Sequence, residues 1–325
     1  MRYLCAGMFP ALQRTLTLAT LKTGAVNRVR SVTESVGGKP VNAARVLKRL
    51  GADPMLFGFA GGDNRTTVER LLDEEGIIHR LVRTSAPVRL AQTLLADDAA
   101  DFTELVEEGP VLAAGDWQRF QAAFAEIVTG DLAAVVLSGT LPAHAPVNAY
   151  AQMIAAAKGG APIILDTSGP ALTAALPLEP TLVKINANEL FQTTGSAAAG
   201  EIRGDDIEKA AQALISSGAQ AVGVTQGGNT AWLVTRHAAR RFTIPKVTVI
   251  STLGCGDAVN AGIAFSLRQC RDMEKAFVFG LACGVSNAMH RLPGMIDPSQ
   301  VNAIAARIIA EPHRSARKPA ASPPR

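Results

Sequence analysis

The chain has 325 residues, of which 48% are apolar and 18% charged, and this balance excludes a disordered or fibrous protein. Its net charge of +4 is concentrated at one end, because residues 311–325 carry +3 and leave only +1 for the rest of the chain. The body has no basic stripe interleaved with aromatic side chains, so we expect no nucleic-acid partner.

The last fifteen residues combine basic side chains with several prolines, among them Pro319, Pro323 and Pro324, a composition that predicts a disordered basic tail over residues 311–325. The four cysteines, Cys5, Cys255, Cys270 and Cys283, form no CxxC pair. No apolar run is long enough to span a membrane. We therefore expect a cytoplasmic protein with reduced thiols and no membrane partner.

Short apolar or β-branched runs alternate with helix-periodic segments along most of the chain. Strands are predicted at Tyr3–Gly7, Met55–Phe59, Ala133–Leu137, Pro162–Leu165, Thr181–Ile185, Ala221–Thr225 and Ala231–Val234. Helices are predicted at Val41–Leu50, Asn64–Glu75, Trp117–Val128, Val147–Lys158, Asp205–Ser217, Asp257–Gln269 and Lys275–His290. The alternation predicts an α/β fold over residues 1–310, with a doubly wound, mostly parallel sheet whose functional loops follow the carboxyl ends of the strands.

Two regions break this alternation. Residues 13–35 and 80–107 are rich in Thr, Val and Arg and lack helical periodicity. We predict that they contribute the strands of a small antiparallel β lid. Such a sheet cannot bury both faces alone, so we expect it to cover the mouth of a site, to pair with a second copy of the chain, or both.

A glycine-rich turn stands directly before the predicted helix that begins at Asp257. Gly254, Cys255 and Gly256 can present free backbone amides to an anion, and the helix dipole favours negative charge there. Asp257 itself has two readings. The segment alone favours an N-terminal cap of the helix. The alternative is a base that takes a hydroxyl proton beside a transferring phosphoryl group.

Two further turns contain glycine. Gly38 and Lys39 open a helix that has Asn42 in its first turn, in a sequence that is neither a Walker A loop nor a dinucleotide fingerprint. Thr225 and Gly227 follow a predicted strand in a turn able to bracket a nucleotide. Each turn taken alone is equally consistent with a purely structural role.

A polar strand end lies between these motifs in the sequence. Lys184 stands near the end of a predicted strand, and Asn186 and Glu189 follow at the start of the next helix. Their spacing places both side chains on one face of that helix. They can form a capping box, or they can jointly hold a hydrated Mg²⁺ ion.

Together these motifs resemble those of the ribokinase-like (PfkB) carbohydrate kinases. The GGK-x-x-N-x-A turn, the K-x-N-x-x-E strand end, the V-T-x-G turn and the G-x-G-D helix start occur in the order and spacing of that family. The text N-R-V at 27–29, A-R-V-L-K-R-L-G at 44–51, L-S-G-T-L-P at 137–142 and L-D-T-S-G at 165–169 is similar to the branch of 1-phosphofructokinases and tagatose-6-phosphate kinases. The resemblance implies a kinase that uses ATP and Mg²⁺ to phosphorylate a hydroxyl of a phosphorylated ketose.

The resemblance also implies residue roles. The catalytic base would be Asp257, and the anion hole would comprise Gly254, Cys255 and Gly256. Nucleotide binding falls to Lys184, Asn186, Glu189, Thr225 and Gly227, with Asn186 and Glu189 holding the metal through water. The sugar hydroxyls would be bound by Gly38 and Asn42, and the substrate's own phosphate by Arg28 and Arg89. Further candidates for substrate binding are Lys39, Ser138 and Gln13.

Three positions depart from the family's pattern. Pro40 stiffens a turn that usually ends in glycine, Gln13 replaces an Asp that ordinarily binds sugar hydroxyls, and Ser251 replaces an Asp before the glycine-rich turn. They leave the identity of the acceptor open. It could be fructose 1-phosphate, fructose 6-phosphate, tagatose 6-phosphate, or an unphosphorylated sugar or nucleoside. A silent sugar-phosphate-binding protein is the alternative, and a homodimer paired through the lid is implied by the resemblance only.

Overall fold

A large twisted sheet organises the molecule. The computed structural model describes residues 1–98, 102–157, 159–196 and 202–312. Within them ten strands form one sheet in the order β14-β13-β12-β11-β10-β9-β8-β1-β4-β5. Their bounds are β1 Arg2–Ala6, β4 Pro54–Gly61, β5 Ile78–Thr84, β8 Leu132–Ser138, β9 Ile163–Asp166, β10 Leu182–Asn186, β11 Ala221–Gln226, β12 Thr230–Thr235, β13 Ala239–Thr243 and β14 Ile309–Pro312. Neighbours from β5 to β11 are parallel, and β12, β13 and β14 add an antiparallel edge.

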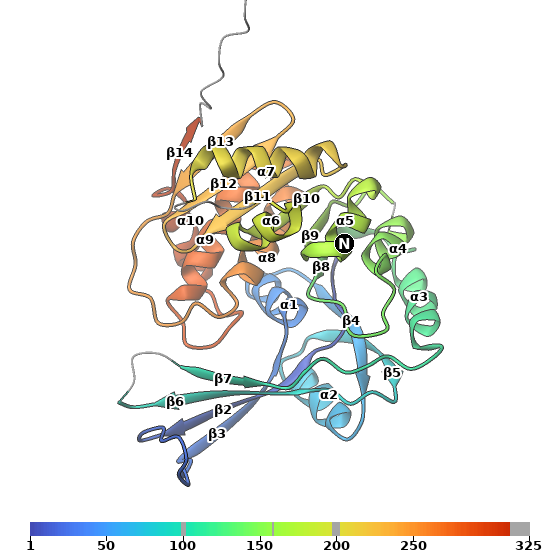
Figure 1. Cartoon of the computed structure of the whole chain (residues 1–325), viewed down its shortest axis with the longest axis vertical. Helices are drawn as coiled ribbons and strands as arrows, with labels where there is room; N and C mark the ends of the chain where they lie inside the picture. The colour runs from blue at the N-terminus through green and yellow to red at the C-terminus, as the bar shows by residue number, and fades with distance from the viewer. Residues whose placement is uncertain (99–101, 158, 197–201, 313–325) are drawn as a thin grey trace, which may run out of the picture.

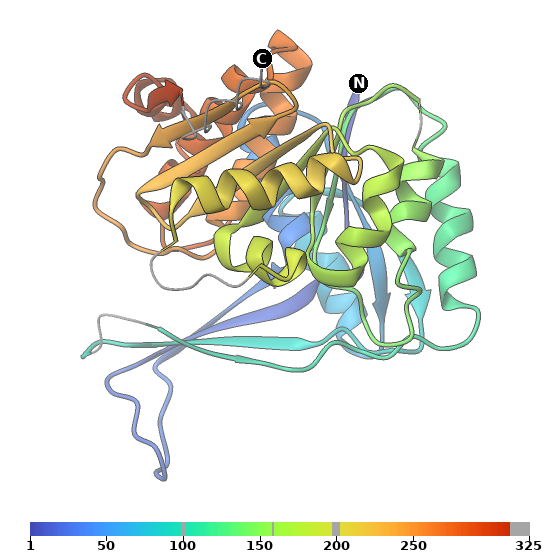
Figure 2. The same ribbon diagram turned by 45° about the horizontal axis from the view of Figure 1, so that its top comes forward.

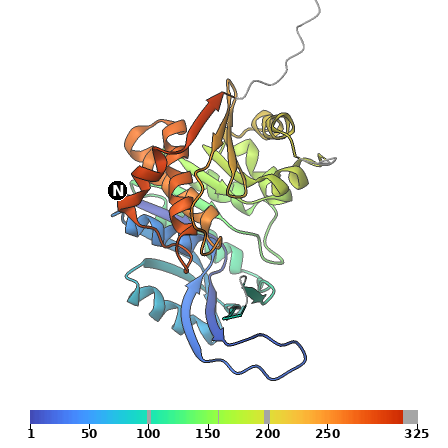
Figure 3. The same ribbon diagram turned by 90° about the vertical axis from the view of Figure 1, so that its left-hand side faces the viewer.

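Helices cover both faces of this sheet (Figure 3). One face is covered by α1 Lys39–Arg49, α2 Asn64–Glu74, α8 Cys255–Cys270, α9 Met273–Ala288 and α10 Pro298–Ala305. The other is covered by α3 Asp116–Ile127, α4 Ala149–Ala156, α5 Gly169–Ala175, α6 Ala187–Thr194 and α7 Gly204–Ser216. In β1, Leu4 packs into the core on one face and Cys5 into the core on the other. Burial on both faces explains the continuous apolar runs in the sequence and confirms the predicted α/β class.

A four-stranded lid projects from the body (Figures 1 and 2). Its order is β3-β2-β6-β7, with bounds β2 Ala11–Leu18, β3 Ser31–Gly37, β6 Leu90–Ala96 and β7 Thr103–Val106. The predicted antiparallel pairing holds for β2 with β3 and for β6 with β7, while the two hairpins meet through a parallel β2–β6 pair.

Two boundaries predicted from the sequence, those of the lid and of the C-terminal tail, differ from the boundaries in the structure. Residues 80–84 lie in β5 of the large sheet, because this strand pairs with β4 from Ile78 to Thr84. The second lid segment therefore begins only at Leu90. At the other end, Glu311 and Pro312 belong to β14, which pairs with β13. The rest of the predicted tail, residues 313–325, lies outside the described residues.

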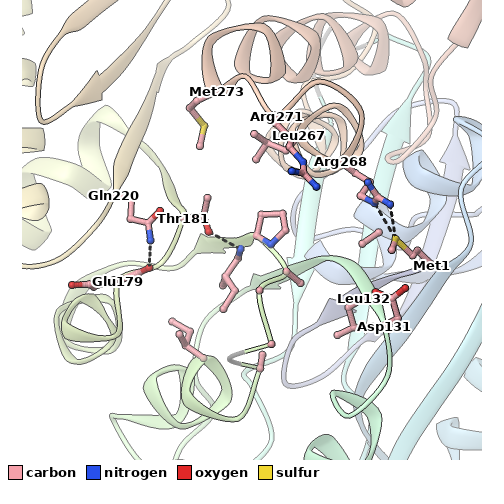
Figure 4. A pocket seen from close by; sticks show the side chains of 18 of the residues that line it. Met1, Asp131, Leu132, Glu179, Thr181, Gln220, Leu267, Arg268, Arg271 and Met273 are labelled. Carbon is pink, nitrogen blue, oxygen red and sulfur yellow. Dashed lines mark hydrogen bonds between the residues drawn. The ribbon is translucent and has the colours of Figure 1, made fainter.

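The two ends of the parallel strands differ in chemistry. The carboxyl ends carry Ser138, Asp166 and Asn186, which are the last residues of β8, β9 and β10. At the opposite edge lies a cavity of about 920 Å³ lined by residues that precede or begin the same strands, among them Leu132, Ile163 and Thr181 (Figure 4). None of the catalytic or binding residues predicted from the sequence lines this cavity. No helix within the described ranges is both long and apolar enough to cross a membrane.

Candidate active site

The glycine-rich turn forms the start of α8. Gly254 is the N-cap residue and has a positive φ of 76°. Its Cα faces Pro293 so closely that an added Cβ would lie 2.7 Å from the Cβ of that proline. The amides of Gly256 and Asp257 have no acceptor in the described part of the chain. Free amides at the amino end of a sixteen-residue helix are able to donate to an anion.

Asp257 does not cap this helix. No side-chain cap bond is present at the start of α8, and Oδ2 of Asp257 instead accepts a 2.8 Å hydrogen bond from Nδ2 of Asn42. The reading as a cap is therefore wrong. The side chain is buried, and burial together with the charge of Asp166 raises its pKa to about 7 against the opposing effects of Asn42, Lys184 and Lys39. A carboxyl group with this pKa can exchange a proton near neutral pH.

A second carboxylate, Asp166, organises the charges beside Asp257. Its Oδ1 accepts from Nζ of Lys39 at 2.6 Å, and its Oδ2 accepts from Nζ of Lys184 at 2.7 Å and from Nδ2 of Asn260 at 2.6 Å. Burial alone would raise the pKa of Asp166, but the two ammonium groups hold that pKa well below its usual range. Asp166 is thus the anion that keeps two lysines side by side.

The two lysines come from different elements. Lys184 is buried near the end of β10, and a Cβ added at Gly256 would lie 2.7 Å from its Nζ. Its ammonium group therefore stands directly against the anion-binding turn. Lys39 begins α1; although burial would lower its pKa, Asp166 reverses the effect and the pKa of Lys39 is raised. Lys39 therefore stays charged at neutral pH.

Asn186 and Glu189 form a complete capping box at the start of α6. The amide of Glu189 donates to Oδ1 of Asn186 at 2.9 Å, and the amide of Asn186 donates to Oε2 of Glu189 at 3.1 Å. The other carboxylate oxygen of Glu189 has no partner in the described part of the chain. The described part of the chain contains no group of three or more His, Cys, Asp or Glu side chains that could hold a metal ion.

The lid contributes Gln13 to the neighbourhood of the Gly37–Gly38 turn. Gln13 is buried, its Nε2 donates to Oγ1 of Thr93 at 2.7 Å, and a Cβ on Gly37 would lie 3.2 Å from its Oε1. Gln13 also lines a cavity of about 310 Å³ that ends at Ser251 and Leu253, just before the turn at Gly254. Gly38 itself is the N-cap of α1, with φ of 120°. The lid and the segment just before the turn at Gly254 therefore border one cavity.

Two candidate substrate ligands have polar atoms without partners. Ser138 is 1% exposed, and its Oγ makes no hydrogen bond within the described chain. Nε of Arg89, next to lid strand β6, is likewise buried and unpaired there. Buried polar groups without partners are rare in folded proteins, and they fit positions that a polar ligand completes.

Three candidates lie apart from the cluster around Asp166. Arg28 is exposed in the connection between β2 and β3, which projects away from the body (Figure 2). Thr225 lies near the end of β11 and Gly227 in the turn after it, with φ of 58°. No hydrogen bond among the described residues links these three to Asp257 or Asp166.

Asp166 and Asn260 are the site residues that sequence reasoning missed. Asp166 appeared only inside a matched segment and received no role. A signal for both existed: Asp166 directly follows a predicted strand, and Asn260 lies three residues after Asp257, on the same face of α8. Their partners lie 127, 18 and 94 residues away in the chain, which no local pattern reports.

A free helix start, a buried carboxyl group and two paired lysines gathered at the strand ends beneath a lid are the features expected of a phosphotransferase. The family model for pfkB family carbohydrate kinases matches residues 11–294 of the chain. The chain therefore belongs to the pfkB family and is an ATP-dependent carbohydrate kinase, as the motifs predicted.

Individual relatives agree with this assignment. The chain is 29% identical over 283 residues to the 1-phosphofructokinase of Bacillus subtilis (strain 168), a match that covers 86% of this chain and 90% of the relative. It resembles the phosphofructokinase-2 of Escherichia coli solved in complex with fructose-6-phosphate, with 26% identity, a TM-score of 0.83, and coverage of 94% of this chain and 98% of that one. The same enzyme in a tetrameric inhibited form gives a TM-score of 0.84 with equal identity and coverage.

Proposed function

We propose that the chain transfers the γ-phosphoryl group of ATP to a hydroxyl of a phosphorylated ketose. The observation that carries the proposal is the position of Asp257. Its carboxyl group, with a pKa raised to about 7, stands one residue after the anion-binding turn at Gly254–Gly256. A base for the attacking hydroxyl and donors for the transferred group are thereby adjacent.

In this mechanism Asp257 accepts the proton of the acceptor hydroxyl as the oxygen attacks phosphorus. The amides of Gly256 and Asp257 are free to donate to the oxygens of the transferring group, whereas the Cys255 amide would first have to leave the carbonyl oxygen of Thr252, 3.4 Å away. Lys184, whose ammonium group touches the same turn, adds positive charge where negative charge gathers. Little covalent chemistry is asked of the protein, so positioning and electrostatics provide the acceleration.

The donor side requires a nucleotide and a metal ion. ATP supplies the phosphoryl group and Mg²⁺ neutralises its oxygens. The unpaired carboxylate oxygen of Glu189 and the side-chain oxygen of Asn186 are the hard ligands that Mg²⁺ prefers, and they suit contact through water, because each residue also serves the capping box. Thr225 and Gly227 stand at the end of the next strand, where a nucleotide would lie.

The acceptor side is formed by α1 and the lid. Gly38, Asn42 and Gln13 are proposed to bind sugar hydroxyls, with Lys39 as a further cation. Ser138 and Arg89, whose polar atoms lack partners, are proposed to bind the sugar and its phosphate. The relatives support this class of acceptor, since one is a 1-phosphofructokinase and another was solved with fructose-6-phosphate.

We also propose that two copies pair through the lid. Val32 and Leu105 are exposed on the same face of the lid, and the connection after β2 exposes Val26, so uncovered apolar side chains lie on that face and in that connection. Arg28 lies in that connection, far from the cluster of its own chain. Pairing of the lids offers a way to bring Arg28 to the acceptor's phosphate in the other copy.

The test is ADP release from Mg·ATP with a panel of acceptors: fructose 1-phosphate, fructose 6-phosphate, tagatose 6-phosphate, free sugars and nucleosides. The proposal predicts turnover that depends on one phosphorylated ketose and is at least tenfold lower with the matching free sugar. Turnover with a free sugar or nucleoside alone would assign the unphosphorylated class. ATP binding without turnover across the panel would indicate a silent sugar-phosphate-binding protein.

A further inference from the structure

The side chain of Asn42 has both of its polar ends engaged. Its Nδ2 donates to Oδ2 of Asp257 at 2.8 Å, while its Oδ1 accepts from Nη1 of Arg45 at 3.3 Å. Arg45 lies one helical turn further along α1. Because an amide has a donor end and an acceptor end, the position of the guanidinium decides which end faces the carboxylate. With the amide reversed, an oxygen would face Asp257.

Arg45 has little freedom to move. Its Nε donates to Oε2 of Glu75 and its Nη2 to Oε1 of Glu75, both at 2.6 Å, in a two-pronged ion pair. Arg45 is only 9% exposed. A Cβ added at Gly294 would lie 3.0 Å from its Cβ, so the backbone there covers its stem. Glu75 is itself tied to α1, because Nζ of Lys48 donates to its carbonyl oxygen.

We propose that Arg45, held by Glu75, is a positioning residue that orients the Asn42 amide so that a hydrogen-bond donor always faces Asp257. Neither Arg45 nor Glu75 touches the reacting atoms. The chain of contacts from Glu75 through Arg45 and Asn42 to Asp257 links the end of α2 to the catalytic turn. This inference rests on the proposed role of Asp257 as the base.

A donor on Asp257 favours its ionised form, which is the form that accepts a proton. The other charged groups that face Asp257 are Asp166, which raises its pKa, and Lys184 and Lys39, which lower it. All three remain in place when Arg45 is changed. Loss of the orienting contact therefore raises the pKa of Asp257, and the rise of kcat with pH moves to higher pH.

The test compares kcat against pH from 5.5 to 9.5 for the wild type, Arg45→Met and Glu75→Gln, with saturating Mg·ATP and acceptor. For Arg45→Met we expect the ascending limb to move up by about one pH unit, with kcat about tenfold lower on the acid side and within about twofold of wild type at pH 9. Glu75→Gln should move the limb in the same direction by a smaller amount. Arg80→Met is the matched control, since it removes an ion pair with Glu126 on the exposed edge of the large sheet, and its profile should be unchanged.

A uniform loss of activity at every pH would overturn the proposal, because a purely structural arginine lowers the amount of active enzyme without moving the limb. If Arg45→Met does not fold, the Glu75→Gln profile decides, and an unmoved limb there overturns the proposal as well. Asp257→Asn, measured in the same series, distinguishes failure of the positioning role of Arg45 from failure of the proposed function. If it is inactive and the limb of the other variants stays fixed, only the positioning role fails. If it keeps normal turnover, the proposed function fails.

Discussion

Lys184 and Gly256 are in direct contact, although they lie on different elements of the fold. A Cβ atom on residue 256 would approach Nζ of Lys184 to 2.7 Å, closer than real Cβ contacts allow. The same ammonium group is fixed by Asp166 at 2.7 Å and cannot swing away without losing that partner. The glycine in this turn is therefore required by the lysine beneath it.

Gly256→Ala should lower kcat by about tenfold or more, because the methyl group displaces either the Lys184 ammonium or the donating amides, and losing one such donor has a large effect. Steady-state kinetics with a thermal melt check this. Gly130→Ala is the control: its added Cβ meets only one carbonyl oxygen, at 3.7 Å, and its kcat should be unchanged. Wild-type turnover in Gly256→Ala would remove the turn from the mechanism.

Asp166→Asn should both destabilise the fold and move the pH profile. Removing the charge leaves Lys39 and Lys184 without their counter-ion, at a cost of about 3 kcal/mol. It also removes a charge that raises the pKa of Asp257, so the ascending limb of kcat should move to lower pH, opposite to the shift expected for Arg45→Met. Denaturant unfolding and a pH–kcat series measure the two effects. A limb that moves to higher pH contradicts this electrostatic picture.

Arg89→Ala should raise KM for the phosphorylated acceptor by at least about tenfold while KM for ATP changes less than twofold, since a cation paired with phosphate provides mainly binding. Arg80→Ala provides the control outside the lid, because Arg80 pairs with Glu126 on the exposed edge of the large sheet. Full acceptor saturation curves give both constants. Equal effects on the acceptor and on ATP would remove Arg89 from the acceptor site.

The raised pKa of Asp257 also predicts how stability depends on pH. In the unfolded chain Asp257 ionises near pH 3.8, whereas in the fold it resists ionisation up to about pH 7. The folded state therefore loses stability between these values and carries the full penalty above pH 7. Asp257→Asn removes the penalty, so its gain in unfolding free energy should be about 2–3 kcal/mol larger at pH 8 than at pH 5.

Thermal and urea unfolding at the two pH values measure this difference. Asp53→Asn serves as the comparison, because Asp53 is an exposed carboxylate paired with Arg2, and its effect should be similar at both pH values. An Asp257→Asn effect that is equal at pH 5 and pH 8 would show that the Asp257 carboxyl titrates as an ordinary surface group.

Much of the fold could be predicted from the sequence, because the central strands are apolar runs buried on both faces and the longer covering helices are periodic. The sequence places residues 80–84 in the lid because they belong to a stretch rich in Thr, Val and Arg without helical periodicity. In the structure they lie in β5 at the edge of the large sheet, where most residues are partly exposed and the strand lacks a continuous buried apolar run. The short helices α5 and α10 were not predicted, since seven or eight residues give few turns from which to recognise a period.

Only those residues of the candidate site that lie in local sequence motifs could be predicted. Asn42, Lys184 and Asp257 were found because each stands at a helix start or strand end, and a parallel sheet gathers those ends. The bond from Asn42 to Asp257 spans 215 residues and was not predicted. It is this contact, absent from any local pattern, that separates a base from a helix cap.

The most direct test of the account is the comparison of Asp257→Asn with the wild type in acceptor-dependent ADP release, with ATP binding measured by calorimetry. If Asp257 is the catalytic base, kcat should fall by at least about 10²-fold while the dissociation constant for Mg·ATP changes less than about threefold. Turnover near the wild-type level in a folded Asp257→Asn would contradict it and leave Asp257 a structural residue at the start of α8.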